Sequence, residues 1–130
     1  MSRYDGHRRV EEVLGKTATK VTQHGDASIH FTFSDGSEYE MVYEPDCCAS
    51  ASIEDVAGDL QDLVGAPLLM SEEVTNSDDA PPASDYAPES YTWTYYKFAT
   101  VKGYVTIRWF GSSNGYYSET ASFNRLKAPQ

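Results

Sequence analysis

The segment YTWTYYKFATVKGYVTIRWF, residues 91–110, decides the fold of this chain. It is dense in aromatic and β-branched residues, which favour strands over helices. Lys102-Gly103 lies between two such runs, 91–101 and 104–110, and is typical of a tight turn in which glycine supplies a positive φ. The segment therefore predicts an antiparallel β-hairpin.

A third strand is expected directly after this hairpin. The loop GSSNG at residues 111–115 contains the small and turn-forming residues that reverse a chain. The segment 116–123 that follows again contains aromatic residues. The C-terminal third is thus predicted to form a three-stranded meander.

A second hairpin is predicted in the first third of the chain. Ile29, Phe31 and Phe33 alternate with polar residues, as in a half-buried strand. The Asp-Gly pair within SDGS, residues 34–37, is a strong hairpin signal, and the return strand is expected at 39–43. A short strand from about Thr17 to Val21 should precede this hairpin and end at the turn cluster 24–26.

The remaining elements are shorter. Apolar residues at 10, 13 and 14 followed by Gly15 indicate one or two helical turns. The segment 47–64 fits either helix or strand spacing, but Gly58 disfavours a continuous helix at a cost of about 1 kcal/mol. We therefore expect a strand to Val56, a short helix over 59–64, and another strand from Leu68 to about 74.

Residues 75–88 are rich in Asn, Ser, Asp, Ala and Pro, a composition that buries too little apolar surface to offset the entropy of ordering. This segment is predicted to be a flexible acidic loop that is dispensable for folding. The rest of the chain predicts one domain, residues 1–130, of α+β or mainly β class, with an antiparallel sheet of roughly seven strands and one or two short helices. Its apolar content of 40% is enough for one core.

The charge distribution is strongly uneven. Sixteen Asp and Glu residues and no Lys or Arg lie between Val21 and Tyr96, and the net charge of the chain is −10. Such a surface repels nucleic acid and membranes and attracts basic proteins; the alternative is an acidic surface that only keeps the protein soluble. The side chains expected to contact a partner are Asp35, Glu38, Glu40, Glu44, Asp59, Asp62, Glu72 and Glu73.

Catalytic and metal-binding patterns are weak. Cys47 and Cys48 are adjacent, so they are expected to be reduced and structural. No histidine stands at a ligand spacing from them, and no nucleophile motif is present, so we predict no catalytic residue, no metal and no cofactor. No signal sequence or long apolar run is visible, which predicts a soluble, cytoplasmic protein.

Two other function classes stay open from the residues alone. A ligand-binding module would place a small molecule or metal ion in a pocket between the C-terminal meander and residues 46–65. A virion or structural component would form an oligomer, and a homodimer through an edge strand is compatible with the sequence. The residues that would line the pocket of the ligand-binding module are Cys47, Cys48, Trp93, Trp109 and Tyr117.

Nine short motifs follow one another in a distinctive order: LGK (14–16), FSDG (33–36), DCC (46–48), IED (53–55), GDL (58–60), DLVG (62–65), TWTYYK (92–97), VTIRW (105–109) and SNGYYS (113–118). Together they resemble an uncharacterised domain family of unknown function that is spread through bacteriophages and prophages. One departure is Ala49, where the family tends to place an acidic residue, which puts a charged site at that point in doubt.

The resemblance implies a phage origin and the host cytoplasm as the location, but it implies no activity. Combined with the charge, it leads to one main hypothesis by analogy. The protein is expected to be a non-enzymatic accessory factor that binds or inhibits a host protein with a basic surface. Its own acidic surface would make this contact by mimicking the negative charge of nucleic acid.

Overall fold

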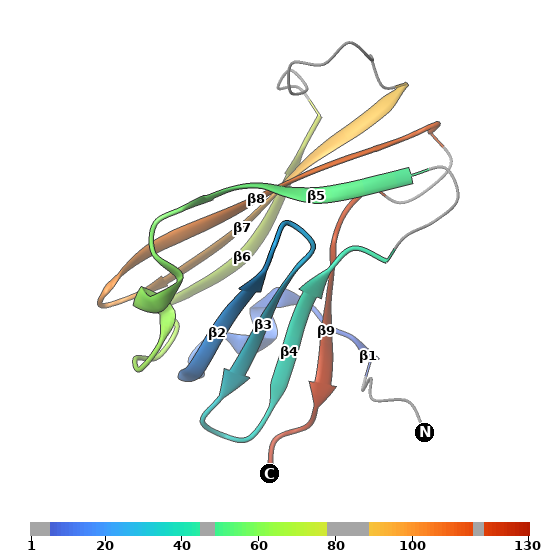
Figure 1. Ribbon diagram of the computed structural model, residues 1–130. Coiled ribbons are helices and arrows are strands. Elements are labelled where there is room, and N and C mark those ends of the chain that lie inside the picture. Colours follow the sequence, from blue (N-terminus) through green and yellow to red (C-terminus); the bar gives the residue numbers. More distant parts are fainter. Residues whose placement is uncertain (1–5, 45–48, 78–88, 116–118) are drawn as a thin grey trace.

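The computed structural model describes residues 6–44, 49–77, 89–115 and 119–130. It consists of two antiparallel β-sheets with their inner faces against each other (Figure 1). The strands are β1 (Gly6–His7), β2 (Ala18–His24), β3 (Ser28–Phe33), β4 (Glu38–Val42), β5 (Ala49–Ala57), β6 (Met70–Asn76), β7 (Ser90–Thr100), β8 (Gly103–Ser113) and β9 (Ser122–Lys127), and the 3-10 helices are η1 (Val10–Val13) and η2 (Leu60–Leu63).

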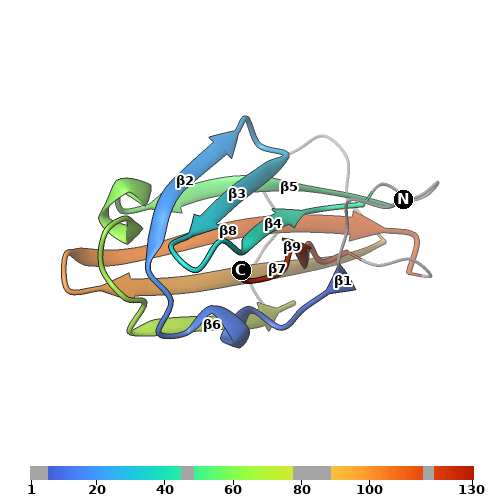
Figure 2. The same cartoon turned by 90° about the horizontal axis from the view of Figure 1, so that it is seen from below.

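The strand order is β1-β9-β4-β3-β2 in one sheet and β5-β8-β7-β6 in the other. The prediction of a mainly β, antiparallel fold is confirmed, but the strands form two sheets instead of one. Each predicted hairpin has one apolar face, and two such faces exclude water best by packing on each other. Figure 2 shows that the strands of the two sheets run in clearly different directions.

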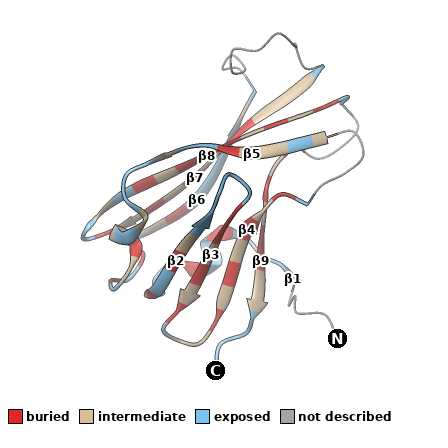
Figure 3. Cartoon of the chain, viewed as in Figure 1, coloured by how far each residue is buried: buried red, intermediate tan, exposed pale blue. Residues whose placement is uncertain are grey.

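The core lies between the two inner faces, where buried side chains alternate along the strands (Figure 3). From the first sheet, Ile29, Phe31 and Phe33 point inward as their alternation predicts, each at most 2% exposed. From the second sheet, Ile107 and Trp109 are fully buried. The period-two pattern thus identified the inward faces correctly.

The hairpin of β7 and β8 is confirmed, but the predicted role of Gly103 is wrong. Val101 and Lys102 form the loop, and Gly103, which pairs with Thr100, does not have a positive φ. A Cβ atom on Gly103 would lie 2.6 Å from Oδ2 of Asp62. A side chain at position 103 would therefore force Asp62 of η2 to shift, so glycine accommodates a contact between segments distant in sequence.

The predicted third strand of the C-terminal meander is also wrong. Residues 111–113 continue β8 instead of forming a loop, and β9 pairs with β4 and β1 in the other sheet. Phe123 explains this placement, since its ring packs 5.2 Å from that of Tyr39 and 5.9 Å from that of Phe31. The meander in the second sheet is instead β6-β7-β8, and residues 116–118 lie outside the described part of the chain.

The smaller elements follow the predictions with modest changes. The two predicted helices are single 3-10 turns, η1 and η2, and strands β5 and β6 lie where they were expected. The prediction placed the start of the loop 75–88 too early, because Thr75 and Asn76 belong to β6 and pair with Thr94 and Trp93. Residues 78–88 lie outside the described part, and no helix in the described ranges is long and apolar enough to span a membrane.

The two sides of the sandwich, where strand edges face each other, differ in how they are covered. On one side η1 packs on edge strand β6, and the Ser71 hydroxyl donates a 2.6 Å hydrogen bond to the Val10 carbonyl. We call this the closed side. On the other side the edge strands are β2 and β5, with η2 beside them, and we call this the open side.

Candidate functional site

The open side contains a hollow between the two sheets. At one end the Ile53 amide of β5 donates to the Asp26 carbonyl in the β2–β3 turn at 2.8 Å, and at the other end the Gly65 amide after η2 donates to the Ala18 carbonyl of β2 at 2.9 Å. Between these bonds the edges diverge around a volume of about 820 Å³. The residues that line it are Lys20, Val21, Thr22, Gln23, Val56, Gly58, Asp59, Leu60 and Gln61.

The hollow combines apolar surface with hydrogen-bond acceptors. Val21, Val56 and Leu60 supply side chains that belong to or pack against the hydrophobic core. The Val21 carbonyl accepts a 3.3 Å hydrogen bond from Nε2 of Gln61, which leaves its second lone pair for another donor.

Asp59 is held at the rim by the start of η2. Its Oδ1 accepts a 2.9 Å hydrogen bond from the Gln61 amide, the usual N-cap arrangement, while the residue itself is exposed. Gly58 has a φ of +104°, and a Cβ there would lie 2.4 Å from the Tyr104 carbonyl oxygen. Only glycine fits this bend, because of its positive φ and because the backbone of the distant Tyr104 lies so close.

Four exposed carboxylates belong to the segments around the hollow: Asp26, Glu54, Asp55 and Asp59. None of them takes part in an ion pair with another described residue. A shift in register between Ile53 and Asp55 forms a bulge in β5, which interrupts strict alternation of its side chains. The lining of the hollow contains one basic residue, Lys20. We call these four carboxylates the open-side acids.

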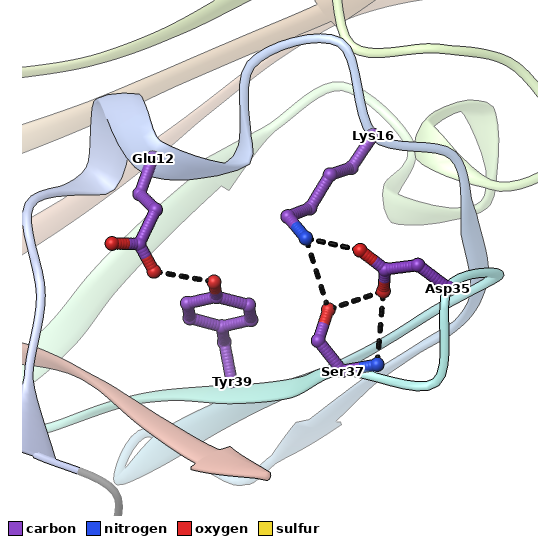
Figure 4. A network of polar contacts seen from close by, with 5 residues as sticks. All are labelled: Glu12, Lys16, Asp35, Ser37 and Tyr39. Carbon is purple, nitrogen blue, oxygen red and sulfur yellow. Dashed lines mark hydrogen bonds and ion pairs between the residues drawn. The ribbon is translucent and has the colours of Figure 1, made fainter. Parts of the chain in front are cut away.

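Charges at the N-terminal segment are arranged differently, as Figure 4 shows. Lys16 forms an ion pair with Asp35 in the β3–β4 turn and donates a 3.3 Å hydrogen bond to the Ser37 hydroxyl. The Ser37 amide donates to Oδ1 of Asp35 at 2.9 Å. Burial alone would raise the pKa of Asp35, but the Lys16 ammonium and the Ser37 donors outweigh it and hold the pKa at about 2.

Glu12 on η1 extends this arrangement. It accepts a 2.5 Å hydrogen bond from the Tyr39 hydroxyl and pairs with Arg8 at 3.7 Å. Burial, together with the nearby carboxylate, raises the pKa of Tyr39 well above its ordinary value. Arg9 and Glu11 form a further pair at 3.7 Å. The acids of this region are thus occupied with structural partners.

A buried carboxylate, Glu119, was not identified from the sequence. It is 9% exposed and accepts hydrogen bonds from the Thr92 hydroxyl at 2.8 Å and the Ser113 hydroxyl at 2.5 Å. Burial would raise the pKa of Glu119, yet the hydroxyl donors lower it below its ordinary value. A Cβ on Gly111 would lie 1.7 Å from the Glu119 carbonyl oxygen. Glycine at position 111 therefore leaves room for the backbone at Glu119. No local motif signals the cluster, because it depends on strand register.

The eight acidic residues singled out from the sequence fall into three groups. Asp35, Glu38, Glu40 and Glu44 are on the β3–β4 hairpin and directly after it, Asp59 and Asp62 are at η2, and Glu72 and Glu73 are on β6. Asp35 is paired with Lys16, and Glu38 lies 3.3 Å from Nε2 of His30. Of these eight residues, only Asp59 lines the hollow.

The structure does not bring Trp93 and Trp109 into one pocket. Trp109 is in the core and donates from Nε1 to the sulfur of Met41 at 3.1 Å. Trp93 is on the opposite face of the same sheet, where Phe110 packs 4.8 Å from its ring and the Arg108 guanidinium 4.9 Å from it. Cys47, Cys48 and Tyr117 lie outside the described residues.

The described residues contain no group of three or more His, Cys, Asp or Glu side chains that could hold a metal ion. The site that remains is the hollow with its acidic rim. It offers a carboxylate, a carbonyl acceptor and apolar contact area, which are groups able to interact with a cation or a hydrogen-bond donor.

Comparison with known proteins gives a family but no activity. No curated protein and no solved structure shows a significant match to the chain. A family model described as a domain of unknown function, DUF7448, matches residues 11–123, which is most of the chain. The chain therefore belongs to the DUF7448 family of domains of unknown function.

Proposed function

We propose that this protein is a non-enzymatic binding protein that docks its acidic open side on the basic surface of another protein. One observation carries the proposal. Basic side chains near the N-terminus pair with the acids around them, whereas the open-side acids have no ion pair with any described residue. Carboxylates grouped without counter-charges are available to a partner.

The overall charge supports this function physically. A net charge of −10 on 130 residues creates a field that attracts basic partners and speeds their association. The same field repels nucleic acids and anionic membranes, so a protein is the favoured class of partner. Because the acids on the rim are exposed, the contact should weaken as salt is added.

The resemblance to phage and prophage domains narrows the partner further. A phage accessory protein acts in the host cytoplasm, and a host protein that normally holds nucleic acid has the basic surface that an acidic docking face requires. Binding or inhibition of such a host protein is the function that we propose.

The test is capture of a partner from bacterial lysate with the intact protein as bait. Parallel captures at low salt and at about 0.5 M salt separate electrostatic from other contacts. We expect a basic protein that is retained at low salt and released at high salt. Recovery of no partner, or of a partner that is insensitive to salt, would contradict the proposal.

A further inference from the structure

We infer that the hollow between β2 and β5 is a pocket for an arginine side chain of the partner, with Asp59 as its carboxylate. This inference rests on the proposed function, which it makes specific in location and chemistry. It is argued from the shape of the hollow, the atoms that line it and the charge around it.

The shape favours a side chain over an extended strand. One edge group of each strand is already in use, because the Ile53 amide of β5 donates to Asp26 in the β2–β3 turn and the Ala18 carbonyl of β2 accepts from Gly65 after η2. An extended chain that paired with the full length of β2 or of β5 would have to break one of these bonds. A side chain that enters from solvent meets no such obstacle, and about 820 Å³ is ample for it.

The lining matches the two chemical parts of arginine. Its methylene stem can pack on the partly buried side chains of Val56 and Leu60. Its guanidinium has five donors in a planar fork, enough to serve two acceptors of the lining, the Asp59 carboxylate and the Val21 carbonyl. The point charge of a lysine ammonium satisfies such divergent acceptors less well.

The charge around the hollow is complementary to a cation. Asp26, Glu54 and Asp55 add negative charge on the surrounding segments, and Lys20 is the one basic residue of the lining. Lys20 should therefore oppose the binding of a cation. Its removal is expected to strengthen binding, and by more than the removal of a lysine far from the hollow, because the repulsion falls with distance and screening.

The experiment is an NMR titration of the ¹⁵N-labelled full chain with N-acetyl-arginine methylamide. The matched probe is the citrulline analogue, which has nearly the same shape without the charge. We expect saturable amide shifts at the lining residues Val21, Thr22, Val56 and Gln61 with the arginine compound only. Shifts spread evenly over all acidic segments, or equal shifts with citrulline, would overturn the inference.

Three variants sharpen the result. Asp59→Asn keeps an N-cap side chain and should weaken binding about fivefold, as expected for a partly exposed charge pair. Lys20→Ala should strengthen binding about twofold. Glu72→Gln on the far edge strand β6 removes the same charge as Asp59→Asn and should change little.

The outcomes separate this inference from the proposed function. If lysate capture depends on salt but arginine produces no shifts at the hollow, the pocket is wrong and the acidic docking function stands. If Glu72→Gln weakens arginine binding as much as Asp59→Asn, the pocket is also wrong. If neither capture nor arginine binding occurs, both are contradicted.

Discussion

The closed and open sides of the sandwich differ in how their edge strands are covered and in how the charges beside η1 and around the hollow are paired. On the closed side, η1 covers edge strand β6, and its valines Val10 and Val13 are almost fully buried. The charged residues of the N-terminal segment are bound to one another and to the β3–β4 hairpin. On the open side the edges of β2 and β5 diverge, and the carboxylates around them face solvent.

This difference separates residues that stabilise the fold from residues that are available for function. Buried apolar contacts and charges held by hydrogen bonds contribute to the free energy of unfolding. Exposed like charges contribute nothing to it, or reduce it through mutual repulsion. Acids that do not stabilise the fold are the ones to which a binding role can be assigned.

The largest expected effect compares one substitution on the two sides. Val13→Ala should lower the free energy of unfolding by about 2 kcal/mol, because Val13, the last residue of η1, is fully buried. Val56→Ala should cost less than about 1 kcal/mol, because Val56 is only half-buried beside the hollow. Urea denaturation at neutral pH measures both. Equal losses would mean that the open side is packed as firmly as the closed side.

The next effect concerns the buried carboxylate. Glu119→Gln should lower the free energy of unfolding by about 1.5 kcal/mol at pH 7, because an amide replaces a charged acceptor of several hydroxyl donors. The folded pKa of Glu119 is depressed, so this stabilisation is present above its unfolded value near 4.5 and is lost on acidification.

Thermal melts of both proteins between pH 7 and pH 3 test the role of Glu119. Their stabilities should converge as the pH falls. A difference that stays constant across this range would show that the charge of Glu119 is not what stabilises the cluster. Ser122→Ala is a suitable control, since its hydroxyl donates to the Val42 carbonyl instead of to a carboxylate.

A smaller effect is expected at Asp35. Its folded pKa of about 2 is below the ordinary 3.8, so its stabilisation is complete above about pH 4 and disappears as the pH falls toward 2. Since about a third of its side chain is exposed, solvent screening limits the effect of Asp35→Asn to about 1 kcal/mol at pH 7. Urea midpoints at several pH values should show the gap between wild type and variant closing in acid. A gap that widens in acid would contradict the ion pair with Lys16.

Local sequence predicted the strands well and their long-range partners poorly. The alternation of Ile29, Phe31 and Phe33 and the Asp-Gly turn define β3 and β4 because both signals act between neighbours. The assignment of β9 to the first sheet depends on Phe123 packing against distant rings, which no local pattern contains. Gly103 was misjudged for the same reason, since its neighbour Asp62 is remote in sequence.

The candidate site was predictable only in part. The excess of carboxylates and the N-cap at Asp59 can be read from composition and spacing. The hollow cannot be predicted from the sequence, because it lies between the edge strands β2 and β5, which only the fold brings together. Which acids are neutralised also depends on the fold, as the pair of Lys16 with Asp35 shows.

The most direct test is the affinity of the captured partner for a variant in which the open-side acids become amides: Asp26→Asn, Glu54→Gln, Asp55→Asn and Asp59→Asn. Its matched control carries Glu38→Gln, Glu40→Gln, Glu72→Gln and Glu73→Gln and has the same net charge. A calorimetric titration at low salt should show affinity at least about tenfold weaker for the open-side variant than for the control, with the unfolding free energy of the open-side variant within about 0.5 kcal/mol of wild type. Wild-type affinity in the open-side variant, or a greater loss in the control, would contradict the account and place the docking surface elsewhere.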